Sequence, residues 1–137
     1  MYELGSAFDD ATMEAGTNVL VAGPPISGKR RLALRALAEG ADRGEGSIVV
    51  TTRDNGERVL EDFEAVVGSP AEADLGIVDC VTKHQGQPVT NSEAVTYTSS
   101  PVDMTGIGIG FSEFIDEFRE ERGLERNRVM LDSISTL

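Results

Sequence analysis

Cysteine, histidine, lysine and tryptophan are nearly missing from this sequence. It has no tryptophan, a single cysteine and a single histidine, and only Lys29 and Lys83 among its twelve basic residues are lysines. Cys80 has no partner for an internal disulfide, which fits a reducing compartment, and it cannot by itself anchor a cofactor. His84 lies in a polar stretch, where we expect an ordinary surface residue in preference to a catalytic base.

Long apolar runs are missing as well. The N-terminal stretch carries Glu3, Asp9 and Asp10 and has no basic segment of the kind that begins a secretion signal. No apolar run approaches the ~20 residues that a membrane-spanning helix needs. We therefore expect a cytoplasmic protein with no membrane partner.

Positive charge is scarce. Twenty-four acidic residues outnumber twelve basic ones, which gives a net charge of -12. Such a surface repels phosphate backbones and anionic lipids, which disfavours a nucleic-acid partner. The many carboxylates and the preference for arginine over lysine favour a halophilic protein, because molar salt screens charge repulsion within about 3 Å. The alternative is an ordinary acidic soluble protein.

The most informative stretch of the sequence is a glycine-rich loop. Residues 23–30 match the phosphate-binding pattern G-x-x-x-x-G-K-[ST] at every position except the last, where Arg30 stands. Backbone N–H groups in such a loop form an anion-binding nest at a helix N-terminus, and the lysine reaches the outer phosphates. The missing Ser or Thr would hold Mg²⁺. Up to the lysine the loop reads Gly23, Pro24, Pro25, Ile26, Ser27, Gly28 and Lys29.

Hydrophobic patterning predicts strands and helices in alternation along the chain. Short β-branched runs predict buried strands, and apolar residues at helical spacing predict amphipathic helices. Strands are expected at residues 17–22, 47–52, 75–81 and 128–133, with a possible strand at 94–98, and helices at 29–39, 57–67 and 111–122. With right-handed crossovers this order predicts an α/β fold, a three-layer α/β/α sandwich with a mainly parallel sheet.

Glycines mark the expected ends of these elements. Gly40 and Gly123 are expected to stop the first and the third helix. The run Gly106–Gly110 lacks the dinucleotide-binding spacing, so we interpret it as a flexible approach to the helix that follows. Residues 1–15 are weakly periodic, which fits either a short helix or a packed arm, and residues 16–137 form the core of a single domain.

Acidic residues follow three of the predicted strands. Asp132 follows the apolar run 129–131, Asp54 follows the second strand, and Asp79 lies at the end of the third. A nucleotide hydrolase needs Mg²⁺ and an oriented water beside its phosphate loop, so an acidic strand end is the second feature to look for. Asp79 either faces this site from a neighbouring strand or caps the turn after it.

Together these motifs resemble the KaiC/RadA branch of the RecA superfamily of P-loop ATPases. Residues 16–25 are similar to the entry of that branch's Walker A loop, residues 47–54 to its second strand and the acidic pair after it, and residues 129–133 to its Walker B strand. The segment 99–111 and the acidic composition also resemble divergent haloarchaeal KaiC-like proteins. The likeness covers residues 16–137 and ends before the strands that complete the nucleotide pocket in that family.

The resemblance implies a nucleotide, in the first place ATP, as the ligand. Residues Gly23 to Gly28 would wrap the β-phosphate, and Lys29 would contact the β- and γ-phosphates, with Arg31 beside them. Asp132 would order Mg²⁺ through water. Asp54 would substitute for the water-activating glutamate, although its side chain is one methylene shorter and catalysis tolerates little displacement.

Three departures from the family pattern weaken this chemistry. Arg30 stands where a hydroxyl should bind Mg²⁺, and a guanidinium is an obligate cation with no lone pair to give. Ile26 stands where glycine is usual, and a β-branched residue resists the positive φ that such loops use. Arg53 replaces the first member of the acidic pair that ends at Asp54.

The sequence therefore supports three functions. The first is a degenerate RecA/KaiC-like domain that binds ATP or another nucleotide through residues 23–29 and acts in regulation or assembly with little or no hydrolysis. The alternatives are an active Mg²⁺-dependent ATPase that uses Lys29, Asp54 and Asp132, and a protein-interaction domain without nucleotide. In each case the last predicted strand lacks the neighbours that the family has, so we expect either a fragment of a longer protein or a sheet edge that self-association or a protein partner covers.

Overall fold

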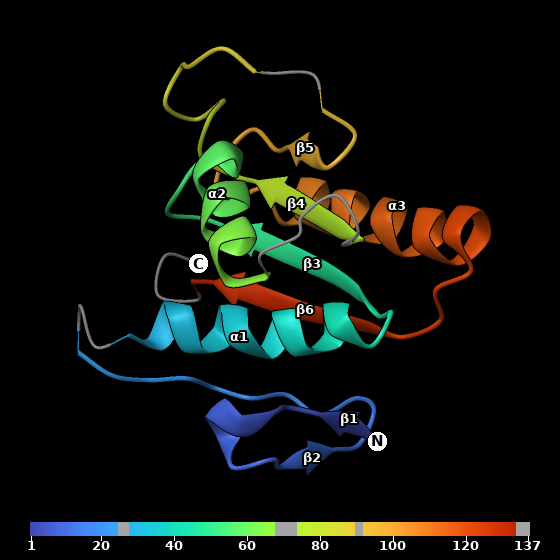
Figure 1. The fold of residues 1–137 in the computed structure, drawn as a ribbon. Helices are drawn as coiled ribbons and strands as arrows, with labels where there is room; N and C mark the ends of the chain where they lie inside the picture. Colours follow the sequence, from blue (N-terminus) through green and yellow to red (C-terminus); the bar gives the residue numbers. More distant parts are fainter. Residues whose placement is uncertain (25–27, 68–73, 90–91, 134–137) are drawn as a thin grey trace.

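The computed structural model describes residues 1–24, 28–67, 74–89 and 92–133, so Pro25, Ile26 and Ser27 of the glycine-rich loop lie outside the described residues (Figure 1). The described chain is an α/β protein. In order, its elements are β1 (Tyr2–Glu3), a 3₁₀ turn (Ser6–Phe8), β2 (Thr12–Met13), α1 (Lys29–Asp42), β3 (Gly46–Thr51), α2 (Gly56–Val67), β4 (Leu75–Asp79), β5 (Val95–Tyr97), α3 (Met104–Arg122) and β6 (Asn127–Asp132).

The main sheet has four strands in the order β5-β4-β3-β6, and every neighbouring pair is parallel. Thr51 at the end of β3 lies in register with Asp79 on one side and with Asp132 on the other. The carboxyl ends of three strands therefore meet at one edge, which also faces the start of α1 (Figure 1). This edge is where ligands bind in open parallel sheets.

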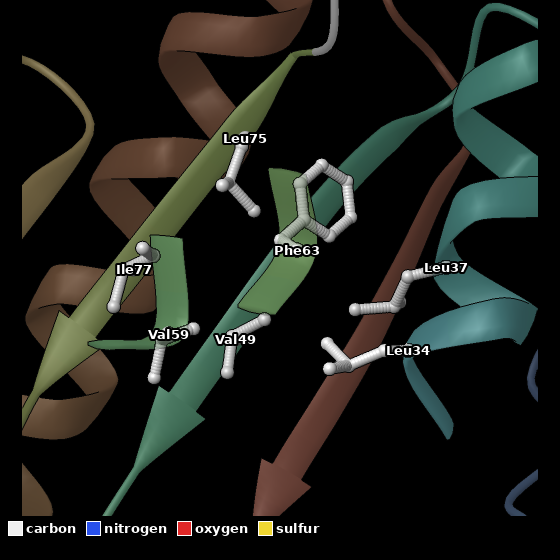
Figure 2. Close-up of a cluster of buried hydrophobic side chains, with 7 residues drawn as sticks. All are labelled: Leu34, Leu37, Val49, Val59, Phe63, Leu75 and Ile77. Carbon is white, nitrogen blue, oxygen red and sulfur yellow. The ribbon is translucent and has the colours of Figure 1, made fainter. Parts of the chain in front are cut away.

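Helices cover both faces of the sheet, an arrangement compatible with a three-layer α/β fold (Figure 1). On one face, α1 packs over β6 and β3 and α2 packs over β4 and β3, and Figure 2 shows apolar side chains of both helices converging on the sheet. On the other face, α3 packs against β3 and β4 through Phe114 and Phe118. The first cluster contains Leu34, Leu37, Val49, Val59, Phe63, Leu75 and Ile77.

The N-terminal arm is a small antiparallel hairpin of β1 and β2 that packs against α1, away from the sheet (Figure 1). Leu4 is buried, and Glu3 forms an ion pair with Arg43 just beyond α1. Of the two interpretations of residues 1–15, the packed arm is the one that the structure supports.

The prediction of a buried strand at residues 17–22 is wrong. These residues form no strand and are largely exposed, with Val19 at 54% and Leu20 at 73% of full exposure. The apolar β-branched run indicates only a local preference for extended backbone, and a strand also needs a hydrogen-bonding neighbour. As a result the described sheet begins with β3, and α1 follows an irregular segment.

The prediction of a flexible glycine run before the third helix is also wrong, because α3 begins at Met104. The carboxylate of Asp103 caps the helix by accepting a hydrogen bond from the backbone N–H of Gly106 at 2.9 Å. Gly110 lies against the sheet, where an added Cβ would come within 2.9 Å of Thr96 Cγ2. Gly110 therefore serves close helix–sheet packing, while Gly123 ends the helix as predicted.

Two smaller predictions need correction. Gly40 does not stop α1, which runs on to Asp42; Gly40 instead gives room to Arg128, whose Nε would lie 2.6 Å from an added Cβ. The last strand is not buried on both faces. It lies at the edge of the described sheet, and its Val129 and Leu131 are 48% and 41% exposed because α3 packs on β3 and β4 on that side.

Candidate functional site

The start of α1 lies at the carboxyl ends of the strands. Gly28 is the residue before the helix, and no side chain among the described residues caps the first turn of α1. Lys29 Nζ donates a hydrogen bond to the backbone carbonyl of Gly23 at 2.8 Å, across the glycine-rich loop. Pro24 and Arg31 are exposed. Among the described residues of the loop, the lysine is thus folded back onto its own chain.

Arg30 lies at the centre of a group of three carboxylates, which we call the Arg30 cluster. Its Nη1 forms an ion pair with Asp54 and lies 3.5 Å from Oδ2 of Asp132, and its Nη2 lies 3.0 Å from Oδ2 of Asp62. Each acid comes from a different element: the β3–α2 connection, α2 and the end of β6. The cluster therefore joins the first turn of α1 to three other parts of the fold.

The end of β3 holds Asp54 and Asp132 in place. Thr51 Oγ1 accepts a hydrogen bond from the backbone N–H of Asp54 at 3.1 Å and donates one to its carbonyl at 2.8 Å. The backbone N–H of Thr52 donates to the carbonyl of Asp132 at 2.8 Å, and the N–H of Ser133 donates to Thr52 Oγ1 at 2.9 Å. Two consecutive threonines thus fix both acidic segments beside Arg30.

Asp62 is the member of the cluster that sequence reasoning missed. It lies in the second turn of α2, and its carboxylate is shared with Arg58 four residues earlier, at 3.2 Å from Nε. On the sequence it looks like one more exposed acid of an amphipathic helix. Only the packing of α1 on α2 brings it to Arg30, so the sequence carries no local signal for it.

Asp79 is a structural residue. It is fully buried, and its carboxylate accepts four hydrogen bonds: from the N–H groups of Gly56, Val81 and Thr82 and from Thr82 Oγ1, at 2.6 to 2.9 Å. Of its two possible roles, the structure supports capping, at the turn after β4 and at the start of α2. It lies on the strand next to β3, but its carboxylate is already engaged by three backbone N–H groups and one hydroxyl.

The residues at this edge do not fit the Mg²⁺ that the family resemblance implies. Arg30 fills the space among the acids and brings a positive charge where an oxygen ligand would be needed. Within the described residues, no group of three or more acidic, histidine or cysteine side chains is arranged to hold a metal ion. Asp54 is itself engaged with Arg30, so it is not set up as a free general base.

Arg30 retains one unused donor. Its Nε is buried and has no hydrogen-bond partner among the described residues. A guanidinium offers five N–H donors, and the two terminal nitrogens already contact the three acids. The side chain as a whole is 27% exposed, so the cluster is reachable from solvent.

Comparison with known proteins places the chain in one family. The family DUF7504, a family of unknown function, matches residues 16–137, so the chain belongs to it. No curated protein and no solved structure gives a significant match. No helix in the described ranges is both long and apolar enough to cross a bilayer.

Proposed function

We propose that this DUF7504 domain is a nucleotide-binding module of RecA/KaiC type that binds ATP or a related nucleotide and hydrolyses it little or not at all. Its output is a regulatory or assembly interaction. The observation that carries the proposal is the Arg30 cluster: a cation of the chain itself stands at the helix start, among the acids that would otherwise serve a metal.

Nucleotide binding is supported by the anion-binding groups at the start of α1. No side chain of the described residues caps the first turn of α1, so its N–H groups and the helix dipole favour a phosphate. Lys29 donates only to a neutral carbonyl oxygen of the loop, and a phosphate would replace that partner with an oppositely charged one. Arg31 adds a second exposed cation next to it.

Weak hydrolysis follows from the same arrangement. Phosphoryl transfer depends on a metal that neutralises developing charge and on a residue that orients water. Arg30 supplies positive charge but cannot coordinate the phosphate and a water as Mg²⁺ does. Asp54, the residue that would orient water, is paired with Arg30. We expect a bound nucleotide to persist unchanged.

A second candidate is a protein-interaction domain without nucleotide. It is favoured by the fact that Lys29 and Arg30 both find partners within the chain. The remaining alternative, a Mg²⁺-dependent ATPase, requires Arg30 to leave its three acids and a metal to enter.

The test is a calorimetric titration of ATP in molar KCl, once with excess Mg²⁺ and once with excess EDTA, on wild type, Lys29→Ala and Lys83→Ala. Lys83 is the matched control, because it is the other lysine of the chain and lies exposed between β4 and β5. We expect binding without metal, weakened roughly tenfold or more by Lys29→Ala and unchanged by Lys83→Ala. Absence of binding in both media would leave the protein-interaction domain.

A further inference from the structure

Strand β6 leaves one side of the sheet open. It pairs with β3 on its inner side, and no strand of the described chain pairs with its outer side. Arg128 and Met130 point toward α1, because Arg128 donates to the carbonyl of Ala36 and Met130 packs against the cluster of Figure 2. By alternation, Val129 and Leu131 point to the opposite face, where they are exposed.

The hydrogen bonds to β3 fix which backbone groups of β6 are free of that strand. The N–H of Gly46 donates to the carbonyl of Arg126, and the N–H of Thr52 donates to the carbonyl of Asp132. In a parallel ladder, residues alternate in the side to which they present their N–H and C=O groups. Arg128, Met130 and Asp132 thus face β3, and Val129 and Leu131 present their backbone groups to the open side.

Among the described residues, the open edge lacks several of the usual protections against pairing. Native edge strands are shielded by prolines, lysines, bulges or a covering segment. β6 contains no proline and no lysine, and its register with β3 is continuous over six residues, without a bulge. It is a straight edge with two exposed apolar side chains.

We propose that β6 pairs with β6 of a second copy of this chain, antiparallel about a two-fold axis at Met130, to make one eight-stranded sheet. In this register Val129 lies opposite Leu131 of the other copy. Both residues present their backbone groups outward, so each such pair exchanges two hydrogen bonds, and symmetry supplies the pair twice. The four exposed apolar side chains meet on one face.

The charges on β6 and the alternation of its backbone groups favour this register over registers shifted by one or two residues. A shift by one residue would place an outward-facing residue opposite an inward-facing one and break the ladder. On the α1 side the proposed register sets Arg128 opposite Asp132 of the second copy, so no like charges face each other at the junction. Centring the axis at Val129 or at Leu131 loses this opposition and keeps a single apolar pair, with the other apolar residue set opposite Asn127 or Ser133.

The rest of the surface makes association salt-dependent. Each copy carries a net charge of -12, so two copies repel in dilute buffer. Molar KCl shortens the screening length from about 10 Å at 0.1 M to about 3 Å at 1 M. The strand itself carries one positive and one negative residue, so we expect the dimer to strengthen as salt rises.

The experiment is light scattering after size exclusion, in molar KCl and in dilute buffer, on wild type, on Val129→Lys/Leu131→Lys, and on Ile109→Lys. Ile109 is the control, because it is an exposed apolar residue on α3 that lies outside the strand edge. We expect wild type at twice 14.6 kDa in molar KCl, the β6 double variant at 14.6 kDa, and Ile109→Lys still dimeric. A monomeric wild type in molar KCl, or a dimer that survives the β6 changes, overturns the proposal.

Disulfide trapping tests the register without relying on the lysine variants. The two Met130 residues lie opposite each other across the axis, with Cα atoms about 4.5 Å apart in a non-hydrogen-bonded pair, which is within disulfide range. Met130→Cys should therefore cross-link on oxidation, and Val129→Cys, tested alone, should not. Cross-linking of Val129→Cys in place of Met130→Cys would refute the axis position, and cross-linking of neither would refute the pairing.

Discussion

An arginine is paired with acid at each end of β3 and β6, with one carboxylate at the amino ends and three at the carboxyl ends, and the two sites differ in how exposed they are to water. At the amino ends Arg128 is 8% exposed and makes two hydrogen bonds to the carboxylate of Glu45, which is equally buried, and one to the carbonyl of Ala36. At the carboxyl ends Arg30 is 27% exposed and meets three acids.

The difference shows how burial gives two arginines, Arg128 and Arg30, different roles. A buried ion pair has given up its water and depends on its partner, so removal of one member is costly. A partly exposed cluster keeps water as an alternative partner, so its members can exchange. Arg128 is therefore a structural residue, whereas Arg30 can exchange one of its carboxylate partners for an anionic ligand.

The largest effect is expected from Arg128→Met. It leaves Glu45 charged and buried without a partner, which should lower the free energy of unfolding by about 3–5 kcal/mol. Urea unfolding in molar KCl measures it. Arg119→Met on the exposed face of α3 is the control and should cost about 0–1 kcal/mol. Equal losses for the two variants would erase the distinction between the two arginine sites.

A smaller loss is expected from Arg30→Met. Its partners are partly hydrated, so stability should fall by about 0–1 kcal/mol, and by less in molar KCl than in dilute buffer. Arg58→Met, which removes an exposed partner of Asp62, is the matched variant. A loss as large as that of Arg128→Met would place the Arg30 cluster among the structural elements.

A pH-dependent change is expected at a third charged group, Asp103, the N-cap residue of α3. Hydrogen bonds from the backbone N–H of Gly106 and from Ser99 hold the pKa of its carboxyl below the ordinary value. The stabilisation is present above the unfolded pKa and is lost as pH falls through the folded pKa. Asp103→Ala should thus be less stable than wild type at neutral pH, and the difference should shrink in acid.

Unfolding at several pH values checks this sign. Asp116→Ala, an exposed acid on the same helix, provides the reference for a carboxylate without a capping role. A difference between wild type and Asp103→Ala that stays constant from neutral to acidic pH would mean that the cap does not act through the charged carboxylate.

Local patterns predicted the elements that carry their own signal. The β-branched run at 47–52 and the stripe of Val59 and Phe63 correspond to β3 and α2 within one or two residues. Acidic strand ends placed Asp54 and Asp132 at one edge, because parallel strands share their carboxyl ends. In these cases the hydrophobic period and the parallel topology are enough to predict the element and the position of its acidic residue.

The failures all depend on packing between distant segments. Residues 17–22 have strand composition but no neighbour in the described sheet, and Gly110 reads as flexible until Thr96 and Val78 are seen against it. The partner of Asp62 is 32 residues away on another helix, and Glu45 meets Arg128 across the start of the sheet. Contacts of this kind leave no period or motif in the sequence.

The most direct test of the central claim is phosphate release from ATP by wild type and by Lys29→Ala, in molar KCl with excess Mg²⁺. Because Arg30 occupies the place among the acids that a metal ion would need, we expect the wild-type rate to match that of Lys29→Ala and to stay unchanged when EDTA replaces Mg²⁺. Metal-dependent release that Lys29→Ala abolishes would contradict the account.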